Sequence, residues 1–239
     1  MNSPLEAIEY LVSKSSYSFD DLCTLVAVLR SENGCPWDRE QTNKSIRNCF
    51  IDETYEFIEG LDNDDNELMC EELGDVLFQI IFHSDIKSDD KAFDVNDVID
   101  GICKKMILRH PHVFGNVSVK NSDEVLSNWE VIKNTEKSRQ TPYEKLDSIS
   151  KSLPSLMRSQ KIISKAQKYS LIENRSFDEI VFSIEHSLKE IKNSQNIDEI
   201  GHLLVEITAL CSLFGVEAEE ILYVENNKLI ENIIKKETV

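Results

Sequence analysis

The sequence is poor in residues that interrupt helices and lacks the features of several protein classes. Only 7 glycines and 5 prolines occur among 239 residues, and no alternating strand pattern stands out. No run of about 18 apolar residues exists, so no transmembrane helix and no membrane partner are expected. The N-terminus has no basic region followed by an apolar segment, and therefore no signal peptide is expected.

Cysteine pairs and positive charge are also scarce. The six cysteines include no C-x-x-C pair, which predicts reduced thiols in a cytoplasmic protein. Lysine and arginine number 26 against 44 acidic residues, a net charge of -18, so duplex nucleic acid and anionic membranes are expected to be poor partners. A small anionic substrate is compatible with this negative charge if metal ions bridge it to the carboxylates. The alternative is that the charge only keeps the protein soluble.

Apolar residues recur mostly at spacings of three and four, which predicts an all-α fold. The chain length allows one large domain or two small ones. Residues 139–153 lie between two helical regions and contain Pro142, so they are predicted to form a connector. The predicted helices are 19–32, 39–60, 65–86, 95–109, 122–138, 154–168, 177–192, 196–214 and 216–235.

Two segments on either side of this connector resemble each other. E-E-L-G-D-V-L-F-Q-I-I (71–81) aligns without gaps to D-E-I-G-H-L-L-V-E-I-T (198–208), with matching Glu, Gly and Leu positions. The match predicts an internal repeat of one helical unit. Chance similarity between two amphipathic helices is the alternative.

Acidic residues occupy the core-facing side of two predicted helices. At about 100° per residue, Glu53 shares a side with Phe50 and Phe57, and Glu56 lies about 60° away. On the next helix, Glu72 shares a side with apolar residues and Asp75 lies about 60° away. A solvated acidic face would lie opposite the apolar stripe.

Four such carboxylates would repel one another, and burial without partners is costly. Divalent cations resolve the conflict, and carboxylate oxygens suit Mg²⁺ or Mn²⁺ better than zinc. The competing interpretation is a salt-bridged helix pair that uses Lys44, Arg47 or Lys105. A metal site of this kind would clamp a phosphate chain, and Lys105 and Arg109, four residues apart, are candidate phosphate contacts.

Four motifs then occur in order and at fitting distances: G-C-P-W-D-R-E-Q (34–41), D-E-T-Y-E (52–56), E-E-L-G-D (71–75) and R-H-P-H-V-F-G (109–115). Together they resemble the MazG family of nucleoside triphosphate pyrophosphohydrolases, closely over residues 18 to 138. L-M-R-S-Q-K (156–161) adds a landmark of the second half.

The resemblance implies tandem all-α modules built around four-helix cores, usually dimeric and Mg²⁺-dependent. It implies hydrolysis of nucleoside triphosphates between the α and β phosphates, giving a monophosphate and pyrophosphate. The family's E-E-x-x-E and E-x-x-D motifs imply Glu53, Glu56, Glu72 and Asp75 as metal ligands and catalytic residues. Its basic residues imply Lys105 and Arg109 as substrate contacts.

The first half departs from the family pattern at two places. Asp52 stands where the first glutamate of E-E-x-x-E is usual, which affects an outer contact of the metal site or the activation of water. Leu108 stands where an arginine often precedes R-H-P-H-V-F-G, so one phosphate contact is absent.

The second half departs more. His186 and Ser187 stand where paired acids belong, and His202 replaces the aspartate, with Glu190 retained. Lys228 remains without the arginines expected after it. The predicted organisation is therefore a catalytic domain at 1–140, a linker at 141–153 and a degenerate, non-catalytic module at 154–239.

The predicted function is Mg²⁺-dependent nucleoside triphosphate pyrophosphohydrolysis by a cytoplasmic homodimer that clears unwanted nucleotides. Two rival interpretations stay open at the level of sequence. One is a nucleotide-sensing protein with little turnover, favoured by the departures from the family pattern. The other is a purely structural helical dimer, which the intact first-half acids oppose.

Overall fold

A computed structural model describes residues 3–137 and 141–237, and no strand occurs among them. The all-α prediction is confirmed. The chain divides into two compact units, Met1–Ser118 and Val119–Val239. The predicted catalytic domain instead ended at residue 140, which lies outside the described residues, so that boundary remains a prediction.

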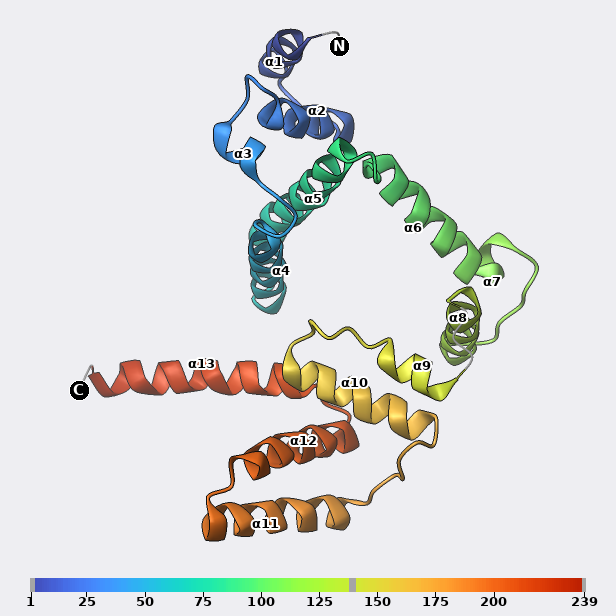
Figure 1. The fold of residues 1–239 in the computed structure, drawn as a ribbon, viewed down its shortest axis with the longest axis vertical. Coiled ribbons are helices and arrows are strands. Elements are labelled where there is room, and N and C mark those ends of the chain that lie inside the picture. The colour runs from blue at the N-terminus through green and yellow to red at the C-terminus, as the bar shows by residue number, and fades with distance from the viewer. Residues whose placement is uncertain (1–2, 138–140, 238–239) are drawn as a thin grey trace. The chain divides into compact units, whose positions relative to one another are not determined.

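The first unit is organised around a pair of antiparallel helices, α4 and α5 (Figure 1). Helix α2 packs on α5, and a small core of Val26, Ile46, Ile81 and Phe82 forms where α2, α5 and the start of α4 meet. The helices of this unit are α1 (Pro4–Val12), α2 (Phe19–Arg30), α3 (Pro36–Glu40), α4 (Arg47–Asp62), α5 (Asn66–Asp89), α6 (Val95–Arg109) and α7 (Pro111–Phe114).

The turn between α4 and α5 is short and tightly built. A Cβ at Gly60 would lie 3.0 Å from the backbone nitrogen of Met69, so glycine permits the two helices to approach here. Asp64 takes a left-handed φ of 53°, and Asp65 accepts the backbone N–H groups of Glu67 and Leu68 to begin α5. This turn sets the register in which α4 faces α5.

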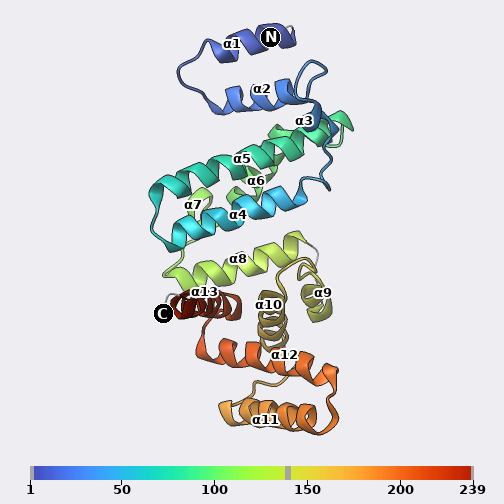
Figure 2. The same cartoon turned by 90° about the vertical axis from the view of Figure 1, so that its left-hand side faces the viewer.

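The second unit repeats the antiparallel pair as α11 and α12, which run side by side as α4 and α5 do (Figure 2). Helix α10 packs across α12, and Ile163, Ile180 and Ala209 form the core between these three helices. The helices are α8 (Ser122–Glu136), α9 (Pro142–Asp147), α10 (Ser155–Lys168), α11 (Phe177–Ser194), α12 (Ile197–Phe214) and α13 (Ala218–Glu237). The predicted repeat therefore coincides with two similar helix pairs.

Most predicted helices occur within a few residues of their predicted ends, but the helix predicted at 39–60 is wrong in its first third. The chain leaves α3 at Glu40 and enters α4 only at Arg47. Between them, Thr42 and Ser45 each accept the other's backbone N–H with a side-chain oxygen, at 2.9 and 3.1 Å. Such side-chain bonds compete with helix formation. The sequence also did not predict α1, α3, α7 or α9, and α9 lies inside the predicted linker.

No single described helix is long and apolar enough to cross a membrane. Helices α12 and α13 pass that test only when taken together as a sharply bent pair, on length and composition alone.

Candidate metal site and its family

Three of the four predicted metal ligands lie together between α4 and α5. Glu53 and Glu56 are one helical turn apart on α4, and Glu72 faces them from α5. One carboxylate oxygen from each lies within 4.8 Å of the other two. Residues three apart lie on the same side of a helix, and here that side meets α5. The short turn between the two helices holds this arrangement in register.

Glu72 is the most deeply placed of these acids. The residue is 5% exposed, and its Oε2 has no hydrogen-bond partner within the described parts of the chain. Burial raises the pKa of Glu72 above 4.5, and the charges of Glu56, Asp75 and Glu53 raise it further. A buried carboxylate oxygen without a partner normally costs free energy, so this oxygen is available to a cation.

The pKa of Glu53 is also raised, first by burial and then by neighbouring negative charges. Among these charges, that of Asp75 has the largest effect on the pKa of Glu53, followed by those of Glu56 and Asp52. An interaction with the Glu72 side chain lowers the pKa and only partly offsets these effects. The electrostatic environment of the cluster therefore disfavours ionised carboxylates unless positive charge is added.

Asp75 does not join the three-residue cluster by ligand-atom distance. It is exposed on α5, one turn after Glu72. Its charge nevertheless raises the pKa of both Glu53 and Glu72.

The donor set fits a divalent cation. Carboxylate oxygens alone line the cluster, one of them buried without a partner, and such hard oxygen ligands suit Mg²⁺ or Mn²⁺. The alternative of a salt-bridged helix pair is not supported within the described residues, because neither Lys44, Arg47 nor Lys105 forms an ion pair with these acids there.

The predicted substrate contacts Lys105 and Arg109 lie on α6. Lys105 is half-buried and Arg109 is 6% exposed. Helix α6 packs on α5 and α7 and runs away from the lower end of the α4–α5 pair (Figure 1). The principal charges acting on Glu53 and Glu72 are all acidic. Within one chain, the structure does not bring the basic pair to the acidic cluster.

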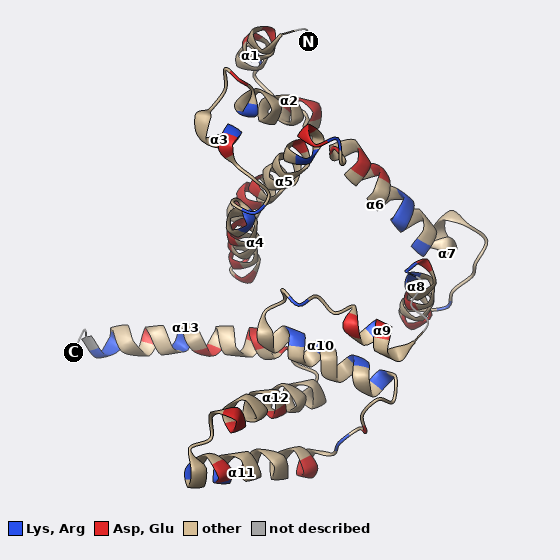
Figure 3. Cartoon of the chain, in the orientation of Figure 1, with Lys and Arg blue, Asp and Glu red and all other residues tan. Residues whose placement is uncertain are grey.

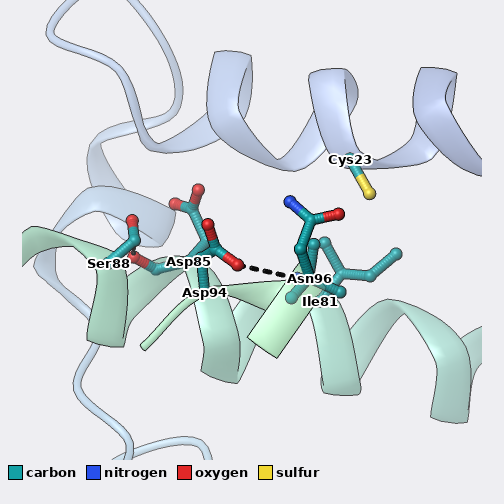
Figure 4. Close-up of a pocket in the computed structure, with 7 residues that line it drawn as sticks. Cys23, Ile81, Asp85, Ser88, Asp94 and Asn96 are labelled. Atoms are coloured by element: carbon teal, nitrogen blue, oxygen red, sulfur yellow. Dashed lines mark hydrogen bonds between the residues drawn. The ribbon is translucent and has the colours of Figure 1, made fainter. Parts of the chain in front are cut away.

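A small cavity of about 120 Å³ lies where α2, α5 and the start of α6 meet (Figure 4). Asp94 begins α6 by accepting the backbone N–H groups of Asn96 and Asp97, at 2.7 and 3.1 Å. Asp85, on α5, is paired with Arg30 of α2. The first contacts begin α6 and the second joins α2 to α5, and the cavity lies beside both.

Three further polar residues lie on α5 or just before α4. Asn43 Nδ2 donates to the backbone oxygen of His83 at 3.0 Å and lies 2.8 Å from His83 Nδ1, which ties the turn before α4 to α5. Gln79 lies two turns after Glu72, is 8% exposed, and its Oε1 has no partner in the described chain. Its i+7 spacing from Glu72 was the only sequence signal for this placement.

The equivalent place in the second unit has a different chemistry. Ser187 is buried on α11 where an acid stands in the first unit, and His186 is exposed. On α12, His202 Nδ1 lies 3.6 Å from Glu199 Oε1 and is largely exposed. Across the described residues, the α4–α5 cluster is the one group of metal-ligand type. Figure 3 shows the acidic residues on α4 and α5.

Comparisons with known proteins agree with this arrangement of helices and acids. The MazG nucleotide pyrophosphohydrolase domain model matches residues 41–114, which include α4, α5 and α6. The first unit therefore belongs to the class of all-helical nucleotide pyrophosphohydrolase domains.

Two relatives match across most of the chain. The nucleoside triphosphate pyrophosphohydrolase of Escherichia coli K12 is 35% identical over 218 residues, covering 87% of this chain and 83% of that protein. The nucleoside triphosphate pyrophosphohydrolase/pyrophosphatase MazG of Thermotoga maritima is 34% identical over 229 residues, covering 92% and 88%. The chain belongs to the MazG family of nucleoside triphosphate pyrophosphohydrolases.

A third relative differs in size. The uncharacterized protein YabN of Bacillus subtilis is 44% identical over 146 residues, which is 61% of this chain. This match spans only 30% of the length of YabN.

Proposed function

We propose that this protein hydrolyses nucleoside triphosphates between the α and β phosphates and releases a nucleoside monophosphate and pyrophosphate. Family membership supports this reaction. The observation that carries the proposal for this chain is the buried, unpartnered Oε2 of Glu72 within 4.8 Å of the Glu53 and Glu56 carboxylates. Such a cluster is costly unless it holds a cation.

Glu53, Glu56, Glu72 and Asp75 would hold Mg²⁺, or Mn²⁺, in this proposal. When bound, a divalent ion neutralises phosphate charge and lowers the pKa of an attacking water. The carboxylates would orient the triphosphate. Asp52 is exposed next to Glu53 and would act only on the outer part of the site.

Lys105 and Arg109 would contact the phosphates and stabilise the charge that develops on them. Because α6 diverges from the acidic cluster in one chain (Figure 1), this role fits an assembly in which α6 meets the acids of a second copy. Exposed apolar side chains along α5 and α6 support a homodimer. They include Leu73 (50% exposed), Leu77 (36%), Ile99 (40%) and Ile102 (42%). The mass of the protein in solution, measured by light scattering, tests this assembly.

The physiological role that we propose is removal of unwanted nucleoside triphosphates in the cytoplasm. The substrates are nucleoside triphosphates, and no nucleic acid or membrane partner is proposed. A second candidate function is nucleotide sensing with little turnover. The separation of Lys105 and Arg109 from the acids within one chain, together with Asp52 and Leu108, favours it.

The decisive experiment measures hydrolysis of a panel of nucleoside triphosphates with Mg²⁺ or Mn²⁺ and separates pyrophosphate from orthophosphate. Wild type is compared with Glu72→Gln and with Glu67→Gln, an exposed acid on the same helix. We expect pyrophosphate release that is lost in Glu72→Gln and retained in Glu67→Gln. Metal-dependent nucleotide binding without release of pyrophosphate would instead support the sensing function.

A further inference from the structure

A larger hollow lies within the second unit, far in sequence from the acidic cluster. Its volume is about 690 Å³, within the usual range of roughly 300–1,000 Å³ for small-molecule pockets. Helix α8, the connection from α9 to α10, α10 itself and the end of α12 form its walls. It belongs to the half of the chain in which the acidic site is degenerate.

The lining of this hollow is basic although the chain is strongly acidic. Lys133, Lys161 and Lys165 line it together with a single acid, Glu217. The formal charges of these four residues sum to +2, against -18 for the whole chain. Lys165 Nζ also donates to the backbone oxygen of Lys145 at 3.1 Å, and Lys133 Nζ lies over the Trp129 ring. Figure 3 shows lysine and arginine along α10, the helix that carries two of these lysines. Lys161 is exposed and forms no ion pair with any described residue.

Hydroxyl groups complete the polar lining. Ser148, Ser150, Ser164 and Ser212 line the hollow. Ser148 and Ser212 donate their hydroxyl hydrogens to the backbone oxygens of Lys145 and Thr208, at 2.7 and 2.9 Å, so Ser150 and Ser164 are the hydroxyl donors to a ligand. Ser150 Oγ accepts the backbone N–H of Ser152 at 3.3 Å, which leaves its hydroxyl hydrogen to donate. Lysine ammonium groups and serine hydroxyls are donors to phosphate oxygens. Ile149, Leu153 and Val216 add an apolar wall beside them.

The two walls of the hollow are held in place by Gln160, which is 6% exposed on α10. Its Nε2 donates to the backbone oxygen of Val216 at 2.8 Å, and its Oε1 accepts the backbone N–H of Ala218 at 2.6 Å. These bonds join α10 to the connection between α12 and α13. The backbone of α10 therefore stands at a fixed distance from the opposite wall, which reduces the conformational freedom lost on binding to that of the side chains.

We propose that this hollow is a second ligand site, which binds a phosphate-bearing anion of nucleotide size. Lys161, Ser150 and Ser164 contact the phosphates, Lys133 and Lys165 add positive charge beside them, and the apolar wall contacts the uncharged part of the ligand. This site differs from the α4–α5 cluster in one testable respect. Carboxylates need a divalent cation to hold phosphate, whereas lysines bind phosphate directly.

The test is isothermal titration calorimetry of the full chain with ATP and, separately, with inorganic pyrophosphate, both in excess EDTA. The chelator suppresses binding at the acidic cluster, so the result is independent of the proposed hydrolysis. We expect both anions to bind, ATP more tightly because it also reaches the apolar wall. Raising the salt concentration should weaken both interactions.

Charge variants assign the binding to this hollow. Lys161→Gln should weaken ATP binding roughly two- to fivefold, and Glu217→Gln should strengthen it by a similar factor. Lys189→Gln, an exposed lysine on α11 outside the hollow, is the matched control and should leave binding unchanged. Absence of binding in EDTA, or equal effects of Lys161→Gln and Lys189→Gln, would overturn the proposal. Pyrophosphate binding without ATP binding would overturn the nucleotide-size assignment.

Discussion

The contact between Asn43 and His83 allows a quantitative test of how α4 is held on α5. Asn43→Ala removes two interactions of the Asn43 amide, at 3.0 Å to the His83 backbone oxygen and at 2.8 Å to Nδ1. Each hydrogen bond contributes about 0.5–1.5 kcal/mol to stability. We therefore expect the free energy of unfolding of the first unit to fall by about 1–3 kcal/mol.

The same contact gives a pH dependence with a definite sign. Because the Asn43 amide donates, neutral His83 accepts at Nδ1 and carries its proton on Nε2. Burial lowers the pKa of His83 below 6.5. His83 therefore takes up a proton near pH 6.5 in the unfolded chain but only at lower pH in the folded chain. The stability that neutral His83 contributes to the fold is thus present above pH 6.5 and is lost as the pH falls. The stability difference between wild type and Asn43→Ala should shrink over that range, because a protonated ring cannot accept.

Native-state hydrogen exchange, read on peptides from α4 and α5, measures the unfolding free energy of this unit separately from the other. Asn48→Ala is the control, because Asn48 is exposed on α4 and its side chain accepts one long hydrogen bond, from Arg47 at 3.5 Å, among the described residues. A change for Asn43→Ala no larger than that for Asn48→Ala would refute the argument. So would a difference from wild type that stays constant between pH 7.5 and 5.5.

Three other predictions concern the site and the two helix pairs. The first prediction applies with a chelator present. Because the pKa values of Glu53 and Glu72 are raised, the folded chain keeps protons that the unfolded chain releases above about pH 4.5. The melting temperature should therefore fall as the pH rises through those raised values. Adding Mg²⁺ at pH 7.5 should reverse the fall in wild type but not in Glu72→Gln, and no response to Mg²⁺ in wild type would contradict the metal site. Gly60→Val should cost about 1–3 kcal/mol by forcing α4 away from α5; Gly101→Ala, with open space at its Cβ, should not destabilise the same unit in urea unfolding. Arg175→Met removes a bidentate pair with Glu206, at 2.9 and 2.7 Å, and should cost about 1 kcal/mol in the second unit by hydrogen exchange; an unchanged exchange rate in α12 would count against it.

Local patterns in the sequence were enough for the helices and for the acids that face one another. The 3.6-residue period predicted core-facing positions for Glu53, Glu56 and Glu72. The structure buries Glu72, half-buries Glu53 and leaves Glu56 exposed, and it brings one carboxylate oxygen of each within 4.8 Å of the others. The reason is that side-chain direction along a helix follows from its geometry alone. The motifs around these residues also indicated the family, which the comparisons confirm. The roles of the individual acids remain predictions.

Tertiary structure decided three features that helical periodicity does not predict: a break between helices, the separation of basic from acidic residues, and the hollow of the second unit. The break at residues 41–46 depends on side-chain bonds between Thr42 and Ser45 and on the link from Asn43 to His83. The separation of Lys105 and Arg109 from the acids follows from the direction in which α6 leaves α5. The basic hollow of the second unit gathers residues from 133 to 217. Periodicity assigns each residue to a face of its own helix, but only packing determines which faces meet, because that depends on contacts between residues far apart in sequence.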